Sequence, residues 1–130
     1  MWYNMKVMEL FLDPENVGVI ENSNGIGEGG DPHCGDHLKL YIKVEGNIIK
    51  DISFQVIGCC AAIASSSMTT ILAKGKTLDE ALKIKENDIV DALGGLPEEK
   101  IHCSVMGAAA LKNAILNYYE NNSDAPDNIQ

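Results

Sequence analysis

Apolar and polar residues alternate over residues 37–57, and this alternation is the clearest pattern in the chain. A period of two is typical of a strand with one buried face. A turn sequence at residues 45–47 interrupts it, so we expect an antiparallel hairpin in which residues 36–44 pair with residues 49–57. The apolar positions of the two strands are Leu38, Leu40, Ile42, Val44, Ile52, Phe54 and Val56.

Helical spacing predicts helices on both sides of this hairpin. Residues 4–12 form a short amphipathic segment with Met5, Met8 and Leu12 on one side and with Val7, Leu10 and Phe11 adjoining them. Residues 59–74 lack alternation, are rich in Ala and Ser, and show helical spacing. The small side chains favour close packing of this second helix against the sheet.

Capping residues predict three further helices towards the C-terminus. Thr77 followed by Glu80 is a capping box, which starts a short helix. We expect Asn87 or Asp88 to cap the next helix. Ser104 is the predicted cap of the last and longest one.

The order of these elements indicates an α+β fold, with a small antiparallel sheet of about three strands and helices packed on one face. Residues 21–36 are rich in Gly, Asn and Asp and predict a loop or a weak edge strand, and residues 96–103 predict a loop. We expect a single domain over residues 1–120 and a disordered tail over residues 121–130.

Composition narrows the classes of function. The chain has 130 residues, 45% of them hydrophobic, and a formal net charge of −9. This charge argues against nucleic acid and anionic membranes as partners. We find no signal peptide and no apolar run long enough to span a membrane, so we expect a cytoplasmic protein. Its four cysteines are then expected as thiols, thiolates or metal ligands.

Three of these cysteines, Cys34, Cys59 and Cys103, lie where predicted elements begin or end. The hairpin brings Cys34 and Cys59 to one end of the sheet, and Asp36 and His102 stand near in sequence. Helix N-termini favour anions, so we expect the thiols of Cys59 and Cys103 to be more acidic than a free thiol. Thiolates are soft ligands for iron–sulfur clusters and zinc.

Simpler explanations remain open at this point. A free cysteine is often a small buried hydrophobe, and His33 and His37 are expected to face solvent. A structural zinc module with inert thiols would use the same residues. A cysteine hydrolase is the weakest alternative, because neighbours in sequence such as His102 and Cys103 seldom face one another.

Three motifs in this order, "GDPHCGD", "GCCAAIASSS" and "KIHCS", resemble the IscU/NifU-type iron–sulfur cluster assembly scaffold. Further similarity lies in "FLDPENVG" and "GKTLDEALKIKENDI", so the resemblance extends from about Met5 to Tyr119. It implies the fold of the NifU N-terminal domain. It also implies a scaffold or carrier, not an enzyme, that builds a labile [2Fe–2S] cluster.

The resemblance also implies roles for individual residues. Cys34, Cys59 and Cys103 match the family's three cluster-binding or sulfur-accepting cysteines. Asp36 matches an aspartate that can ligate and that makes the cluster labile. His102 matches a possible alternative ligand. Zinc is a further possible occupant of these residues in cluster-free members.

The implied partners are a cysteine desulfurase, which supplies sulfur, and apo-proteins, which receive the cluster. We expect Cys103 to be the first sulfur acceptor, because a loop before the last helix would leave it exposed and mobile. A monomer or weak homodimer is expected. The competing hypothesis is a zinc-dependent protein that transfers persulfide sulfur without building a cluster.

The chain departs from the family at three places. Cys60 stands where a small residue is common, and we interpret it as a packed first-turn residue, with an accessory thiol as the alternative. The family's chaperone-docking motif reads here "LPEEK", residues 96–100, and its two added carboxylates argue against docking of a dedicated chaperone. His33 stands where a small apolar residue is usual in the family. Lys100, by contrast, matches a family lysine at the site.

Overall fold

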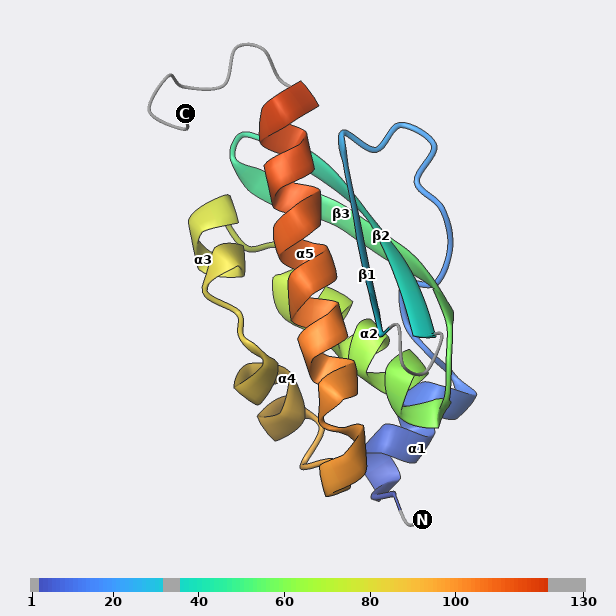
Figure 1. The fold of residues 1–130 in the computed structure, drawn as a ribbon. Coiled ribbons are helices and arrows are strands. Elements are labelled where there is room, and N and C mark those ends of the chain that lie inside the picture. The colour runs from blue at the N-terminus through green and yellow to red at the C-terminus, as the bar shows by residue number, and fades with distance from the viewer. Residues whose placement is uncertain (1–2, 32–35, 122–130) are drawn as a thin grey trace.

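A computed structural model describes residues 3–31 and 36–121. This part of the chain forms a three-stranded antiparallel sheet in the order β1-β2-β3, together with helices that cover one face of it (Figure 1). The expected α+β class is therefore confirmed. The elements are α1 (Met5–Leu12), β1 (Gly25–Asp31), β2 (Asp36–Glu45), β3 (Ile48–Ile57), α2 (Cys60–Ala73), α3 (Leu78–Leu82), α4 (Glu86–Ala92), the 3₁₀ turn η1 (Glu98–Lys100) and α5 (His102–Asn121).

The hairpin of β2 and β3 forms as expected, with one local change in register. Val44 pairs with Ile49 as predicted, but a bulge shifts the pairing by one residue, so that Ile42 faces Ile52. Ile49 and Ile52 are both buried although they are three positions apart, which strict alternation does not allow. The bulge keeps the apolar face of β3 on the core side.

Helix α5 crosses the sheet against β1, which forms the predicted edge strand within residues 21–36 (Figure 1). Gly25, Gly27 and Gly29 face it, and a Cβ atom added at any of them would overlap the backbone of α5. Two side chains of α5 also bond to β1: the Asn117 Oδ1 atom accepts from the amide of Ile26, at 2.9 Å, and Asn113 donates to a carbonyl of the same strand. Close contact and these bonds fix α5 over the edge of the sheet.

The core lies between the sheet and helices α2 and α5, and a second cluster joins α1, α2 and α4. The largest fully buried side chains of the two clusters together are Phe54, Leu38, Leu40, Ile42, Ile49, Ile52, Leu78, Ile89, Leu93, Leu111, Ile115 and Val7. The capping box of Thr77 and Glu80 is present, with hydrogen bonds of 3.0 and 3.2 Å.

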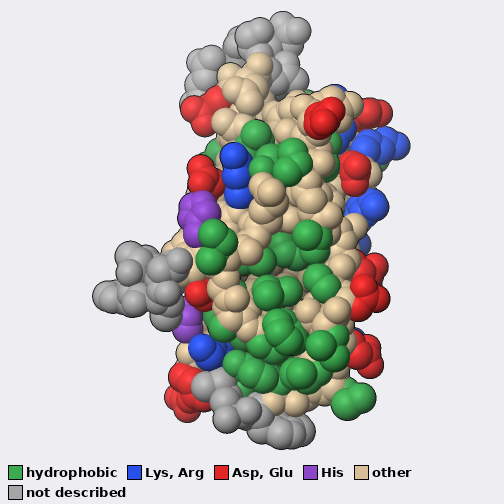
Figure 2. All heavy atoms as spheres, turned by 90° about the vertical axis from the view of Figure 1, so that its right-hand side faces the viewer, with side chains coloured by type: hydrophobic (Ala, Val, Ile, Leu, Met, Phe, Trp, Pro, Cys, Tyr) green, Lys and Arg blue, Asp and Glu red, His purple; other side chains and the backbone are tan. Residues whose placement is uncertain are grey.

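The buried side of α1 is the adjoining apolar side and not the side of Met5 and Leu12. Val7 and Leu10 are buried, whereas Met5 and Leu12 are 76% and 73% exposed. Apolar residues cover all of this helix except the side of Lys6 and Glu9, so their spacing alone does not select the buried side. Figure 2 shows hydrophobic side chains gathered over the lower part of the molecular face on which α1 lies.

Two predicted helix starts are wrong. Helix α4 begins at Glu86, and Asp88 is not its cap but accepts a hydrogen bond from the Lys85 amide at 2.9 Å. Helix α5 begins at His102 and leaves Ser104 in its first turn, where the hydroxyl bonds to the Ile101 carbonyl. The loop predicted over residues 96–103 therefore contains a 3₁₀ turn and the start of a helix. The tail expected at residues 121–130 lies, after its first residue, outside the described residues.

Candidate metal centre

Three element ends meet at one end of the sheet. Asp36 is the first residue of β2, Cys59 is the N-cap of α2 directly after β3, and Cys103 lies in the first turn of α5. One ligand atom from each, a carboxylate oxygen and two sulfurs, lies within 4.8 Å of the others. The antiparallel pairing explains part of this, because the start of β2 lies beside the end of β3.

Gly58 provides space for this arrangement. A Cβ atom at this position would lie 3.0 Å from the Asp36 carboxylate carbon and 2.7 Å from the Ala62 side chain. A larger residue would therefore displace either the carboxylate or the first turn of α2. The sequence analysis did not single out Gly58, although a glycine between a strand and a cysteine was a usable signal.

The thiol of Cys103 is buried and is not acidic, which corrects our expectation for it. Its exposed fraction is 0%, and it lies in a helix instead of on an exposed loop. Burial, followed by the nearby Cys59 sulfur, raises the pKa of Cys103 to about 12. Burial of the sulfur therefore outweighs the stabilisation that the N-terminus of α5 would give to a thiolate.

Lys100 supplies a positive charge to the site. Its ammonium group lies close enough to the sulfur of Cys59 that the charge on Cys59 is the main reason why the pKa of Lys100 is raised. Burial is the main reason why the pKa of Tyr3 is raised, and the nearby sulfurs of Cys59 and Cys103 raise it further. Sequence reasoning missed Tyr3, because nothing in its local pattern connects it with the cysteines.

The other residues considered for the site are the three histidines and Cys34. The Nε2 atom of His102 lies 3.8 Å from the sulfur of Cys103, so these neighbours do approach each other, but His102 is not within 4.8 Å of the whole group. His37 faces solvent as expected and pairs with Glu28 at 2.7 Å. Cys34 and His33 lie outside the described residues, so the predicted meeting of Cys34 with Cys59 stays a prediction.

The donor set fits a thiophilic metal. Zinc–sulfur bonds are about 2.3 Å long, so two sulfurs on one tetrahedral ion lie about 3.8 Å apart. The 4.8 Å group of Asp36, Cys59 and Cys103 needs only a small contraction to reach that geometry. Two sulfurs and one carboxylate suit zinc or iron.

Sequence comparison identifies similar proteins along nearly the whole chain. The chain is 53% identical over 120 residues to the iron-sulfur cluster assembly scaffold protein IscU 1 of Archaeoglobus fulgidus, covering 92% of this chain and 78% of that protein. It is 48% identical over 118 residues to the IscU scaffold protein of Aquifex aeolicus, covering 89% and 75%. It is 56% identical over 127 residues to the nitrogen fixation protein NifU of Trichormus azollae, where it spans 91% of this chain and 42% of the relative.

Solved structures show the same fold. A putative iron-sulfur cluster assembly scaffold protein for the SUF system from Fervidobacterium islandicum superposes with a TM-score of 0.72 at 26% identity, covering 87% of this chain and 96% of that one. The N-terminal part of a NifU-like protein from Brucella abortus, at 19% identity and a TM-score of 0.58, shares the fold alone. The NifU-like N terminal domain family matches residues 2–125, and the chain belongs to this family.

Proposed function

We propose that this protein is a scaffold on which an iron–sulfur cluster is assembled and from which it is passed to apo-proteins. The observation that carries the proposal is the meeting of Asp36, Cys59 and Cys103 within 4.8 Å at one end of the sheet. Relatives about half identical to this chain are named as cluster assembly scaffolds. Cluster and iron are cargo here, so the site must both hold and release them.

The mixed donor set suits such a cargo site. We propose that Cys34 joins Cys59 and Cys103 as the third thiolate, that Asp36 supplies an oxygen, and that His102 is an alternative ligand. A carboxylate is a harder and weaker ligand for cluster iron than a thiolate, so a cluster held partly by Asp36 leaves more readily. A [2Fe–2S] cluster matches four protein ligands. Zinc is the expected occupant when iron and sulfide are lacking.

Sulfur arrives by thiolate chemistry in this proposal. A thiolate of the scaffold attacks the terminal sulfur of a cysteine desulfurase persulfide, forms a new S–S bond, and releases the desulfurase thiolate. We propose Cys103 as this first acceptor. Because its thiol is buried and its pKa is about 12, the first turn of α5 must open, or metal must displace the thiol proton, before Cys103 reacts. Lys100 is placed to stabilise the resulting negative charge on sulfur.

The proposed setting follows from the same chemistry. Free thiols persist in a reducing compartment such as the cytoplasm. Among the described residues, no helix is long and apolar enough to cross a membrane. We propose a desulfurase and apo iron–sulfur proteins as partners, with the carboxylates of Glu98 and Glu99 weakening any dedicated chaperone contact. A monomer or weak homodimer suffices for this cycle.

The test is anaerobic reconstitution with ferrous iron, cysteine and a cysteine desulfurase, followed by absorption and Mössbauer spectra. We expect a [2Fe–2S] spectrum that is lost in the Ala variants of Cys34, Cys59 and Cys103. The matched control is Cys60→Ala, which removes an adjacent thiol and is expected to keep the spectrum. The reconstituted cluster should also transfer to an apo-ferredoxin. Persulfide with tightly held zinc and no cluster would instead indicate a sulfur-transfer protein.

A further inference from the structure

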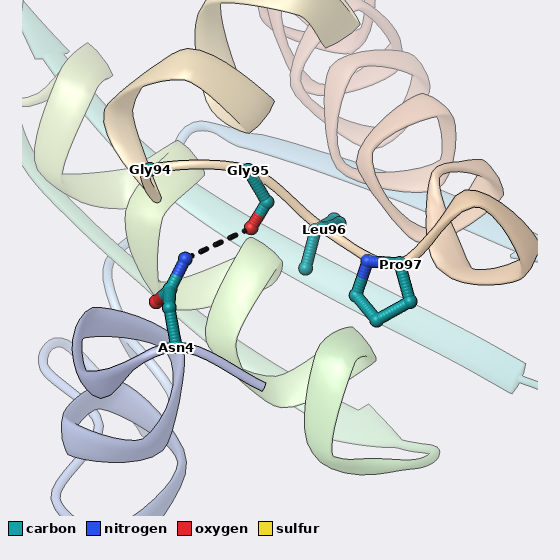
Figure 3. A pocket seen from close by; sticks show the side chains of 5 residues that line it. All are labelled: Asn4, Gly94, Gly95, Leu96 and Pro97. Atoms are coloured by element: carbon teal, nitrogen blue, oxygen red, sulfur yellow. Dashed lines mark hydrogen bonds between the residues drawn. The ribbon is translucent and has the colours of Figure 1, made fainter. Parts of the chain in front are cut away.

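Asn4 joins two parts of the molecule that are far apart in sequence. Its Oδ1 atom accepts a hydrogen bond from the Val7 amide at 2.9 Å and so caps α1. Its Nδ2 group donates to the carbonyls of Leu93, at 3.0 Å, and Gly95, at 3.2 Å. Figure 3 shows the amide pointing from α1 to the loop that follows α4. One side chain therefore caps a helix and holds a loop.

Few hydrogen bonds other than those from Asn4 hold this loop, although the side chain of Leu93 at its start is fully buried. Gly94 and Gly95 have φ angles of 79° and 109°, and their amides bond only back to α4. The loop borders a surface hollow of about 430 Å³, lined by Asn4 and residues 94–97, so its outer side is not packed. Leu96 contacts the core, but among the hydrogen bonds of the described residues those from Asn4 are the ones that tie residues 93–95 to another element.

This loop leads directly into the candidate metal centre. The Pro97 carbonyl accepts from the Lys100 amide at 2.8 Å and starts the 3₁₀ turn. Lys100 ends this turn with its charge close to the sulfur of Cys59, and α5 begins two residues later with Cys103 in its first turn. A shift of residues 93–97 therefore moves both the cation and one of the sulfurs relative to Cys59.

We propose that Asn4 is a positioning residue for this centre, because its two donated hydrogen bonds fix the loop that places Lys100 and Cys103 against Cys59. The inference deepens the proposed function, on which it rests, and assigns Asn4 no contact with metal or sulfur. Removing the Nδ2 donor of Asn4 should therefore make Cys103 more accessible and weaken metal binding, even when the cap of α1 is kept.

Two variants separate the two halves of the side chain. Asn4→Ser keeps a capping oxygen but cannot reach the loop, and Asn4→Asp keeps the cap and replaces the donor by a carboxylate. The matched control is Asn24→Ser. Asn24 also makes side-chain bonds to backbone atoms, donating to the Val44 carbonyl at 2.9 Å and accepting from its amide at 2.8 Å, at the other end of the sheet. Both Asn4 variants retain the helix cap, so both should fold.

The first measurement is the alkylation rate of each thiol in the reduced, metal-free protein, at urea concentrations that equalise global stability. The buried thiol of Cys103 reacts only after local opening. We expect Asn4→Ser and Asn4→Asp to speed its alkylation about tenfold relative to Asn24→Ser, with the rate at Cys60 unchanged. Equal Cys103 rates in the Asn4 and Asn24 variants would overturn the inference.

The second measurement is Zn²⁺ affinity by competition with a chromophoric chelator. We expect about tenfold weaker binding in the Asn4 variants than in Asn24→Ser, and equal affinities would again contradict the positioning role. Different results would overturn the proposed function and the positioning role of Asn4. A wild-type protein that binds no zinc and builds no cluster overturns the proposed function, whereas normal wild-type binding with unaffected Asn4 variants overturns only this inference.

Discussion

The sulfur of Cys60 lies 4.0 Å from the sulfur of Met8, on the side of α2 that faces α1. Its neighbour Cys59 lies instead with Asp36 and Cys103. Cys60 is the first residue of α2, is half-buried, and packs against the cluster formed by α1, α2 and α4. Cys60 therefore lies in the first turn and packs as expected, and its lack of a role as an accessory thiol stays a prediction. Two adjacent cysteines thus have different surroundings.

We expect this difference to separate their functions. Cys60→Ala should keep zinc binding and cluster assembly and lower the free energy of unfolding by only about 1 kcal/mol, because it removes one partly buried sulfur. Cys59→Ala should abolish metal binding, because it removes a central ligand. Titration with Zn²⁺ and urea unfolding of both variants provide the check. Loss of metal binding in Cys60→Ala would make Cys60 an accessory ligand.

Metal should protect the thiols selectively. In the metal-free protein, Cys59 and Cys60 are half-buried and Cys103 is fully buried, so we expect Cys103 to be alkylated last. Added Zn²⁺ should slow alkylation of Cys59 at least tenfold and leave Cys60 unchanged, since only Cys59 belongs to the ligand group. Mass spectrometry of timed samples measures each site. Equal protection of both half-buried thiols would argue against the assigned ligand group.

The sheet was predictable because its signal is local. Alternation over residues 37–57 indicated which side chains of β2 and β3 face the core. The three-residue spacing of Ile49 and Ile52 reflects the bulge in β3. It indicates a bulge only when both side chains are known to be buried. The buried side of α1 was not predictable, because it depends on contacts with α2 and α4 that its own apolar pattern does not encode.

Part of the candidate site was likewise predictable from the sequence, and part depends on tertiary packing. Strand pairing alone placed Asp36 near Cys59, whereas the approach of Cys103 depends on how α5 packs on three glycines of β1. The burial that raises the pKa of Cys103 follows from α5 starting at His102, two residues earlier than its predicted cap. Tyr3 reaches the sulfurs through tertiary packing, which no sequence spacing reports.

The glycines of β1 give a sharp test of that packing. A Cβ atom at Gly27 would overlap the Ala110 carbonyl oxygen and the Ala114 backbone, so Gly27→Ala must push α5 away from the sheet. We expect a loss of about 3 kcal/mol or more in the free energy of unfolding, measured by urea denaturation. Ile26→Ala is the control on the same strand, since its side chain is 37% exposed, and should cost about 1 kcal/mol or less. Similar losses in both variants would show that α5 does not approach β1 this closely.

The capping box of α3 predicts a specific loss of stability in acid. Hydrogen bonds from the backbone and side chain of Thr77 hold the pKa of Glu80 below its ordinary value. A carboxylate whose pKa is lower in the folded state stabilises that state above its ordinary pKa, and this contribution disappears as the pH falls through the folded value. The folded state should therefore lose this contribution as the pH falls below about 4.3, the ordinary pKa of glutamate, and through the lower folded value.

Comparing urea midpoints with those of Glu80→Gln isolates the charge, because glutamine still accepts a hydrogen bond from the Thr77 amide. Wild type should have the higher midpoint at neutral pH, and the difference should shrink steadily as the pH falls below about 4.3, the ordinary pKa of glutamate. Glu86→Gln is the matched control, since Glu86 lies in the first turn of α4 but Asp88 bonds back to the start of that helix. A Glu80→Gln difference that stayed constant with pH would mean that the carboxylate charge does not stabilise α3, and that the hydrogen bonds alone start this helix.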